Sequence, residues 1–259
     1  MNPVPRTRQR GTLQRRVRSL GLGALASLLL VVFGFVIWAN SPYQADREAT
    51  LKVFRDGNIV VEAVDEGILM TFVADSVDLP EESVGLVFVP GARVDPYAYL
   101  YQLSGIVEQH GVTVLITEPT LNLAFFDTRE LDEFSVAAPG VDRWFLGGHS
   151  LGGVRACLMA PDSDAEGLVL LGSYCANDLS GGELPVLSLA AENDGLTSLE
   201  TITDAADLLP RDARFEVIQG ANHAAFGDYG AQSGDGQREI TSPQMRQRLT
   251  ALLAEFLLD

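Results

Sequence analysis

The sequence is poor in cysteine and histidine, the residues that most often bind transition metals. It has three histidines and two cysteines, Cys157 and Cys175, among 259 residues. They form no CxxC pair and no His/Cys cluster with the spacing of metal ligands, so we expect no metal site. We expect the two cysteines to be buried free thiols, although a disulfide is permitted if they lie outside the cytoplasm.

Basic residues are scarce beyond the N-terminus. Six of the 18 Lys and Arg are arginines within the first 18 positions, and no acidic residue appears before Asp46. Removing those six leaves 12 basic against 35 acidic residues, so positions 40–259 carry a net charge of about −23. Such a surface favours solubility and repels phosphate backbones, so we expect no nucleic-acid partner.

Charge is also absent from Leu20 to Ala39. A helix of that length spans a bilayer core, and the run exceeds the apolar stretch of an ordinary cleaved signal peptide. Trp38 lies near its end, where an amphipathic ring suits the membrane interface. Because the arginines precede the run, the positive-inside rule predicts a cytoplasmic N-terminus and an extracytoplasmic domain. A cleaved signal and a buried helix are the alternatives.

The chain is therefore expected to have four parts. Residues 1–19 form an Arg-rich cytoplasmic segment, 20–39 a transmembrane anchor, and 40–50 a polar linker. Residues 51–259 are long enough for one α/β domain with a single core.

Short apolar runs predict the strands of this domain. The runs at 50–54, 58–64 and 68–74 are separated by turn signals and predict antiparallel strands at the start of a sheet. From Val84, near-continuous apolar runs alternate with helical patterns, as in a mostly parallel sheet with helices on both faces. The strands expected in this second part are 84–90, 112–117, 143–148, 167–173, 185–191 and 214–220.

Two helices of the domain have recognisable ends. Asp95 suits the N-cap of a helix with Pro96 in its first turn, and Gly111 follows the end of that helix. Thr241 or Ser242 precedes the last helix, whose apolar residues keep helical spacing.

A serine lies between glycines in the stretch GHSLG, residues 148–152, which fits G-x-S-x-G. The pattern alone is weak, but this copy follows the predicted strand ending at Gly148 and opens a predicted helix over 151–160. That setting is typical of a nucleophile elbow, in which Ser150 is held in a strained turn. Gly148 and Gly152 provide room where strand and helix backbones crowd together. The alternative is a serine that caps a helix in a glycine turn.

A serine hydroxyl needs a general base to act as a nucleophile, and the chain offers three histidines. His149 neighbours Ser150 and is expected to point away from it and pack. His110, beside Gly111, suits the C-terminal dipole of a helix. His223 follows the last predicted strand and is the expected base.

The acid that orients the base is expected between Ser150 and His223, in the order Ser…Asp/Glu…His. Asp194 follows a predicted strand and is the preferred candidate. Glu192, nearer that strand, and Asp178, after the preceding strand, are the alternatives.

An oxyanion hole needs two backbone N–H donors. One is expected from Leu151, directly after the nucleophile, and the other from Ala92, in the loop after strand 84–90. Gly91 permits close backbone approach there. Arg93 suits a surface ion pair or, alternatively, a substrate carboxylate.

Together these stretches resemble the α/β-hydrolase superfamily, from about residue 50 to 259. The similarity is to a compact bacterial branch of dienelactone-hydrolase-like and esterase-like proteins, and it rests on PGARVDPYAY, GGHSLGG, ENDGLTS and GANHAAFGDYG. The resemblance implies an α/β-hydrolase fold with nucleophile Ser150, acid Asp194 and base His223. The 11 residues 174–184 between two strands are too few for the helical cap of larger members.

The sequence therefore predicts a membrane-anchored, extracytoplasmic serine hydrolase that needs no cofactor and acts on a small-molecule ester. A peptidase or acyltransferase using the same residues is the first alternative, and a non-catalytic protein with this fold is the second. Because a cap is missing and the Gly-rich loop 226–241 is expected to be mobile, we expect an open site that favours short acyl esters.

Overall fold

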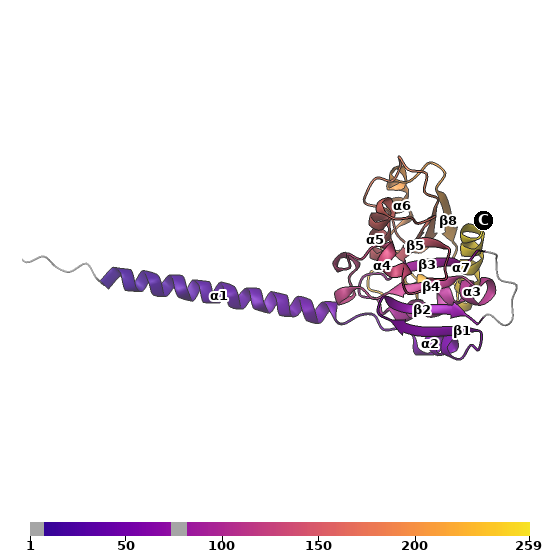
Figure 1. The fold of residues 1–259 in the computed structure, drawn as a ribbon. Helices are drawn as coiled ribbons and strands as arrows, with labels where there is room; N and C mark the ends of the chain where they lie inside the picture. Colours follow the sequence, from indigo (N-terminus) through magenta and orange to yellow (C-terminus); the bar gives the residue numbers. More distant parts are fainter. Residues whose placement is uncertain (1–7, 74–81) are drawn as a thin grey trace, which may run out of the picture. The chain divides into compact units, whose positions relative to one another are not determined.

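The computed structural model describes the backbone of residues 8–73 and 82–259, and side chains from residue 19 onward (Figure 1). The chain divides into two compact units, Met1–Ser41 and Pro42–Asp259. Residues 1–7 of the expected cytoplasmic segment and Ala74 of an expected strand lie outside the described residues.

The first unit consists of one long helix, α1 (Arg8–Ala39). Its part from Ser19 to Ala39 has a mean hydropathy of 2.6 and is long enough to cross a membrane. A membrane anchor and an N-terminal signal sequence share these properties. The expected apolar run at 20–39 is thus helical.

The second unit is built on an eight-stranded sheet with the order β1-β2-β4-β3-β5-β6-β7-β8 (Figure 1). β1 and β2 are antiparallel to each other, β2 is antiparallel to β4, and the strands from β3 to β8 are parallel to their neighbours. The strands are β1 (Ile59–Val64), β2 (Gly67–Phe72), β3 (Val84–Val89), β4 (Thr113–Thr117), β5 (Arg143–His149), β6 (Leu168–Leu171), β7 (Val186–Ala191) and β8 (Arg214–Ile218). The mostly parallel sheet and its antiparallel start are as predicted.

Helices cover both faces of the sheet and separate two apolar layers. On one face, α3 and α7 pack together over side chains such as Phe88 and Phe145, and on the other α4 and α5 cover Val87 and Leu146. The helices of this unit are α2 (Arg47–Phe54), α3 (Leu100–His110), α4 (Leu131–Ser135), α5 (Leu151–Met159), α6 (Leu199–Asp204) and α7 (Ser242–Leu257). Short 3₁₀ turns join them: η1 (Pro96–Tyr99), η2 (Thr120–Asn122), η3 (Ala124–Phe126), η4 (Ala160–Asp162), η5 (Ala206–Leu208) and η6 (His223–Phe226).

The predicted helix ends are present. Asp95 accepts a hydrogen bond from the N–H of Tyr97 at the start of η1, which runs on into α3. Gly111 ends α3 in the left-handed conformation, at φ 69°. Thr241 caps α7 and accepts from the N–H of Gln244.

The prediction of a strand over 50–54 is wrong, because these residues belong to α2. Asp46 caps this helix and accepts from the N–H of Ala49. Ala49 and Val53, four residues apart, are its buried side chains. The buried positions therefore repeat with the period of a helix and not with the two-residue period of a strand. The segment expected as a linker also folds partly onto the domain, since the N–H of Tyr43 donates to the Arg93 carbonyl at 2.6 Å.

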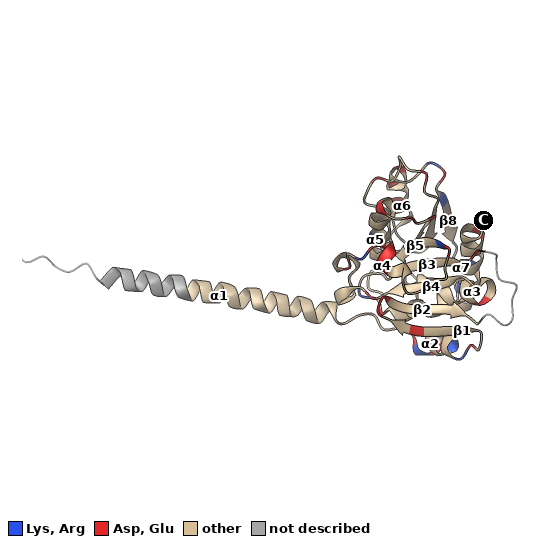
Figure 2. Ribbon diagram, in the orientation of Figure 1, with Lys and Arg blue, Asp and Glu red and all other residues tan. Residues whose placement is uncertain are grey.

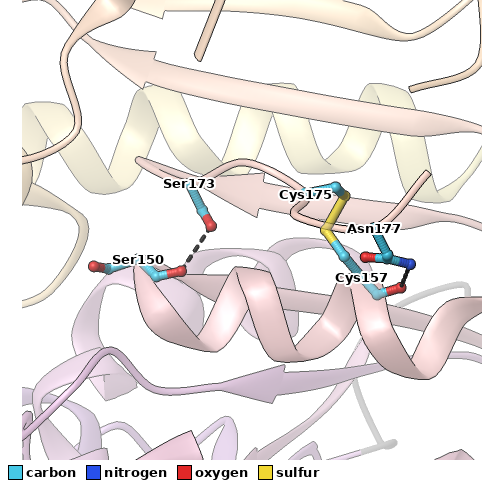
Figure 3. Close-up of a disulfide and its surroundings, with 5 residues drawn as sticks. All are labelled: Ser150, Cys157, Ser173, Cys175 and Asn177. Atoms are coloured by element: carbon cyan, nitrogen blue, oxygen red, sulfur yellow. Dashed lines mark hydrogen bonds between the residues drawn. A yellow bond between two sulfur atoms is a disulfide. The ribbon is translucent and has the colours of Figure 1, made fainter. Parts of the chain in front are cut away.

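The expectation of two free thiols is also wrong. Cys157, on α5, and Cys175, after β6, form a disulfide with Cα atoms 5.5 Å apart, and both residues are buried (Figure 3). The Nδ2 of Asn177 donates to the carbonyl of Cys157 at 2.9 Å beside it. The sequence could not show that α5 and this segment lie side by side, which is what the bond requires.

Charged residues are distributed over helices, strands and loops of the domain (Figure 2). Some pair across the sequence, as Arg143 does with Glu166 at 2.6 Å and Arg214 with Glu255 at 2.7 Å. The acidic residues in excess are therefore spread over many segments of the domain and are not concentrated in one.

Candidate active site

Ser150 lies in the strand–turn–helix setting that the sequence predicts. It follows the last residue of β5 and precedes α5, with φ 53° and ψ −123°. A positive φ is strained for any residue with a Cβ, so the fold itself holds this serine in place. Its side chain makes no capping hydrogen bond to α5, which removes the alternative of a simple helix cap.

The glycines around Ser150 are required by close packing. A Cβ on Gly148 would overlap the backbone of Gly152, and a Cβ on Gly152 would overlap the carbonyl oxygen of Val89. On the other side, the Oγ of Ser173 donates to the Ser150 carbonyl at 2.6 Å (Figure 3). The turn is thus held between the ends of β3 and β6.

Asp194 and His223 meet at the ends of β7 and β8. The Oδ2 of Asp194 lies 2.8 Å from the Nδ1 of His223, and the two side chains are 0% and 1% exposed. The other oxygen, Oδ1, accepts from the N–H groups of Leu196 and Thr197 at 2.8 and 2.6 Å. With one oxygen held by its own loop, the carboxylate presents the other to the imidazole and leaves Nε2 free to accept a proton.

The two alternative acids have other partners. Glu192 accepts from the N–H of Gly220 at 2.8 Å and ties the loop after β7 to the loop after β8. Asp178 is exposed and accepts from the N–H and hydroxyl of Ser180 within its own turn, contacts that lower the pKa of the Asp178 carboxyl. Of the three candidates, only Asp194 contacts His223.

His149 is buried and packs against His223, a packing role that the sequence predicts. The two rings are 4.4 Å apart between centroids. Burial, and then the neighbouring His223, hold the pKa of His149 well below its usual value, while an interaction with the His223 backbone opposes them. His149 is therefore a neutral ring that packs against the imidazole of His223.

Tyr99 connects this ring to the loop after β3. Its hydroxyl lies 2.9 Å from the Nδ1 of His149 and accepts from the N–H of Gly91 at 2.9 Å. Burial raises the pKa of Tyr99 far above its usual value, so the phenol stays protonated. No local sequence pattern points to Tyr99, because its two partners lie 8 and 50 residues away.

The loop after β3 leaves one backbone donor available. Gly91 donates to Tyr99, and Arg93 donates to the carbonyl of Asn122 at 2.7 Å. Among the described residues, the N–H groups of Ala92 and Leu151 have no protein acceptor. These are the two donors that the sequence assigned to an oxyanion. The guanidinium of Arg93 lies over the ring of Tyr43, 5.6 Å from its centroid.

Within the described residues, no hydrogen bond joins the hydroxyl of Ser150 to His223. In hydrolases without substrate this contact is often long and tightens only in the complex. Ser150 directly follows His149, and the ring of His149 packs against that of His223. Ser150 and His223 therefore lie at the same end of the sheet.

Part of the loop 226–241 is bound to the site, contrary to the expected mobility. Asp235 accepts from the N–H groups of His223, Ala224 and Gly195, at 3.1, 2.9 and 3.2 Å. No local pattern predicts these hydrogen bonds, because an Asp next to Gly is an ordinary turn residue.

Sequence comparison places the chain in a known family. A sequence model of the alpha/beta hydrolase family matches residues 85–247, which is more than half of the chain and includes Ser150, Asp194 and His223. No curated protein sequence matches the chain.

The fold is similar to that of solved structures. One is the crystal structure of TT1662 from Thermus thermophilus, with 16% identity, 78% of this chain and 99% of that chain covered, and a TM-score of 0.54. Another is Est1E from Butyrivibrio proteoclasticus, with 12% identity, 78% and 100% covered, and a TM-score of 0.49. At 16% identity, the similarity to TT1662 speaks for the fold alone. With the match over residues 85–247 and the mostly parallel eight-stranded sheet, this chain belongs to the alpha/beta hydrolase family.

Proposed function

We propose that the protein is a serine hydrolase that cleaves small carboxylic esters through an acyl-enzyme. The observation that carries the proposal is the buried contact of 2.8 Å between Asp194 and His223, at the end of the sheet where Ser150 has a strained positive φ. A nucleophile, a base and an orienting acid in this chain order are the parts that acyl transfer needs.

In the first half of the reaction, the Oγ of Ser150 attacks the ester carbonyl carbon and His223 Nε2 takes the hydroxyl proton. Asp194 keeps the proton of Nδ1 in place and stabilises the imidazolium. The tetrahedral intermediate then collapses, the bond to the alkoxy group breaks, and His223 returns the proton to the departing alcohol.

In the second half, water attacks the acyl-enzyme. His223 takes one proton from the water, and the second tetrahedral intermediate expels Ser150, which recovers its proton. The products are a carboxylic acid and free enzyme, and every step uses groups of this chain.

The oxyanion of both intermediates is proposed to bind the N–H groups of Ala92 and Leu151. Both lack a protein acceptor among the described residues, and Leu151 is the first residue of α5, where a helix has free donors. One such donor typically contributes about 10²- to 10³-fold to turnover.

The proposed location is the outer side of a membrane, with α1 as an uncleaved anchor. The apolar helix Ser19–Ala39 and the arginines before it support this orientation, and the Cys157–Cys175 disulfide supports an oxidising compartment. A tag at the N-terminus is expected to resist protease added outside intact cells. Release of the domain into the medium with an N-terminus near Asn40 would instead indicate a cleaved signal.

A fluorophosphonate probe tests the nucleophile. The full-length chain in detergent should be labelled at Ser150, and Ser150→Ala should abolish labelling and ester hydrolysis together. Ser180→Ala, in an exposed turn, is the matched control and should be labelled normally. Labelling that persists in Ser150→Ala contradicts the proposal. Esters and amides of the same acyl group, with and without an acceptor alcohol, distinguish an esterase from a peptidase or acyltransferase.

A further inference from the structure

The segment 234–237, which we call the clamp loop, lies between the acid and the base of the proposed site. The Nδ2 of Asn193 donates to the carbonyl of Gln237 at 3.1 Å, on the side of the acid. The Nδ2 of Asn222 donates to the carbonyl of Gly236 at 2.9 Å, on the side of the base. The clamp loop is thus bonded to the residue before Asp194 and to the residue before His223.

The carboxylate of Asp235 is the centre of this arrangement. Its Oδ1 accepts from the N–H of Gly195 at 3.2 Å and from the N–H of His223 at 3.1 Å. Its Oδ2 accepts from the N–H of Ala224 at 2.9 Å, and Oδ1 also contacts the N–H of Gly236 at 2.7 Å. A single side chain therefore joins the backbone beside the acid to the backbone of the base, and charge-assisted bonds of this kind are the strong ones.

Two glycines permit the approach. A Cβ on Gly195 would overlap the carbonyl oxygen of Gly234, and a Cβ on Gly236 would overlap the carbonyl oxygen of Asn193. Side chains at either position would therefore separate the clamp loop from the acid loop.

We propose that Asp235 is a positioning residue for the reaction proposed above, on which this inference rests. It holds the segments of Asp194 and His223 in register, so that the imidazole keeps its contact with the acid and its aim at Ser150. Asp194 and His223 are 29 residues apart in the chain, and the 2.8 Å contact between them depends on where both loops lie. A misplacement of about 1 Å in such a site can cost about 10²-fold in rate.

Kinetics of the full-length chain with a water-soluble ester give the first test. Asp235→Ala is expected to lower kcat by about 10- to 100-fold while KM stays within about twofold. Asp235→Asn, which keeps one acceptor oxygen, should recover part of the loss. The matched control is Asp142→Asn, since Asp142 likewise accepts from a distant segment, the N–H and hydroxyl of Ser83, at 2.9 and 2.8 Å.

The control separates positioning from general loss of stability. Melting temperatures of both variants are measured alongside the rates, and Asp142→Asn is expected to lose stability without losing kcat. A kcat of Asp235→Ala within about twofold of the wild type overturns the proposal. The proposal is also overturned if Asp142→Asn, with a melting temperature equal to that of Asp235→Ala, loses kcat to the same extent.

A double variant tests whether Asp235 acts through the acid–base pair. In an Asp194→Asn background the acid no longer orients the imidazole, so adding Asp235→Ala should lower kcat by less than about twofold further. Losses that multiply in full would show that Asp235 acts independently of that pair and would overturn the proposal.

A measurement without turnover distinguishes failure of this proposal from failure of the proposed function. Histidine labelled with ¹⁵N gives signals from only three imidazoles, and the ring N–H of His223 is identified by its loss in Asp194→Asn. In Asp235→Ala this N–H should exchange with water at least about tenfold faster, as expected when its hydrogen bond loosens. An unchanged exchange rate overturns the positioning role, whether or not the enzyme cleaves esters. If the exchange rate changes but the protein cleaves no ester, the esterase proposal is rejected and the positioning role of Asp235 is retained.

Discussion

At the scale of single residues, the two histidines of the site differ in what surrounds their rings. The Nδ1 of His223 lies 2.8 Å from an oxygen of the Asp194 carboxyl group. His149 contacts the phenol of Tyr99, and its Nε2 has no hydrogen-bond partner among the described residues. Burial keeps His149 neutral, so it adds no positive charge beside the ring of His223.

Replacement of the acid should impair the base. Asp194→Asn is expected to lower kcat by about 10⁴-fold, because an amide favours the wrong tautomer of His223. Ester hydrolysis and circular dichroism of the full-length variant measure activity and fold together. Asp178→Asn is the control and should have wild-type activity. If Asp194→Asn leaves kcat nearly unchanged while Glu192→Gln or Asp178→Asn lowers it strongly, the acid is assigned to the wrong residue.

His149 should make stability depend on pH. Its pKa is lowered in the folded state, so below the unfolded value of about 6.5 the unfolded chain binds a proton that the folded chain does not. The fold should therefore lose about 1 kcal/mol between pH 6.5 and 5.5 from this group, and its contribution should be constant above pH 7.5.

Urea unfolding at pH 7.5, 6.5 and 5.5 measures this dependence. His149→Gln is expected to be less stable at every pH but to lose less on acidification than the wild type, while His110→Gln, on the surface end of α3, serves as the control. Equal losses in wild type and His149→Gln would contradict the assignment.

At the scale of elements, local patterns predicted most of the sheet and the turn at Ser150. The strands β3 to β8 coincide with uninterrupted apolar runs, because strands covered on both faces need apolar side chains throughout. α2 was missed because an eight-residue helix with two buried side chains leaves little periodicity to detect.

What the sequence could not predict are contacts between distant segments. The contact between Asp194 and His223 could be predicted because the order of residues in a known family brings the two together. Asp235, Tyr99 and the disulfide follow no local pattern, since each depends on which loops the finished sheet places side by side.

The disulfide joins two elements that hold Ser150 from both sides. Cys157 is in α5, which begins directly after Ser150, and Cys175 follows Ser173, whose hydroxyl donates to the Ser150 carbonyl (Figure 3). For a loop of this length the chain-entropy model gives about 3 kcal/mol. Cys157→Ala with Cys175→Ala should therefore lower the melting temperature by several degrees.

Reductant provides the control for this prediction. A thiol reagent strong enough to open the bond should lower the wild-type melting temperature and leave that of the double variant unchanged. Two free thiols titrated in the unfolded, unreduced protein would show that the bond does not form.

At the scale of the whole molecule, two segments of the described chain are candidates for a cap over the proposed site. The described chain between β6 and β7 carries the disulfide and turns but no helix or strand. The loop 226–241 could have provided a movable cover, but its clamp loop is bonded at the acid and the base. Neither segment is therefore available as a cap.

Substrate size should follow from this open site. Apolar side chains after β4, β6 and β7 are exposed at the end of the sheet that carries Ser150: Phe125 at 61%, Tyr174 at 36% and Leu196 at 40%. We expect them to contact the first carbons of an acyl chain. An enclosed tunnel would add about 0.8 kcal/mol, or about fourfold in kcat/KM, for each further CH₂ that it buries.

We therefore expect kcat/KM to rise from acetyl to butyryl esters and then to level or fall, with no increase when substrate passes from monomer to micelle. A panel of esters with one leaving group, measured on the full-length chain above and below the micellar concentration, decides this. The Ser150→Ala chain gives the uncatalysed rate at each length. A kcat/KM that climbs about fourfold per CH₂ to long chains, or a jump at the micellar concentration, would mean that the exposed side chains around Ser150 close over an acyl chain or bind a lipid surface.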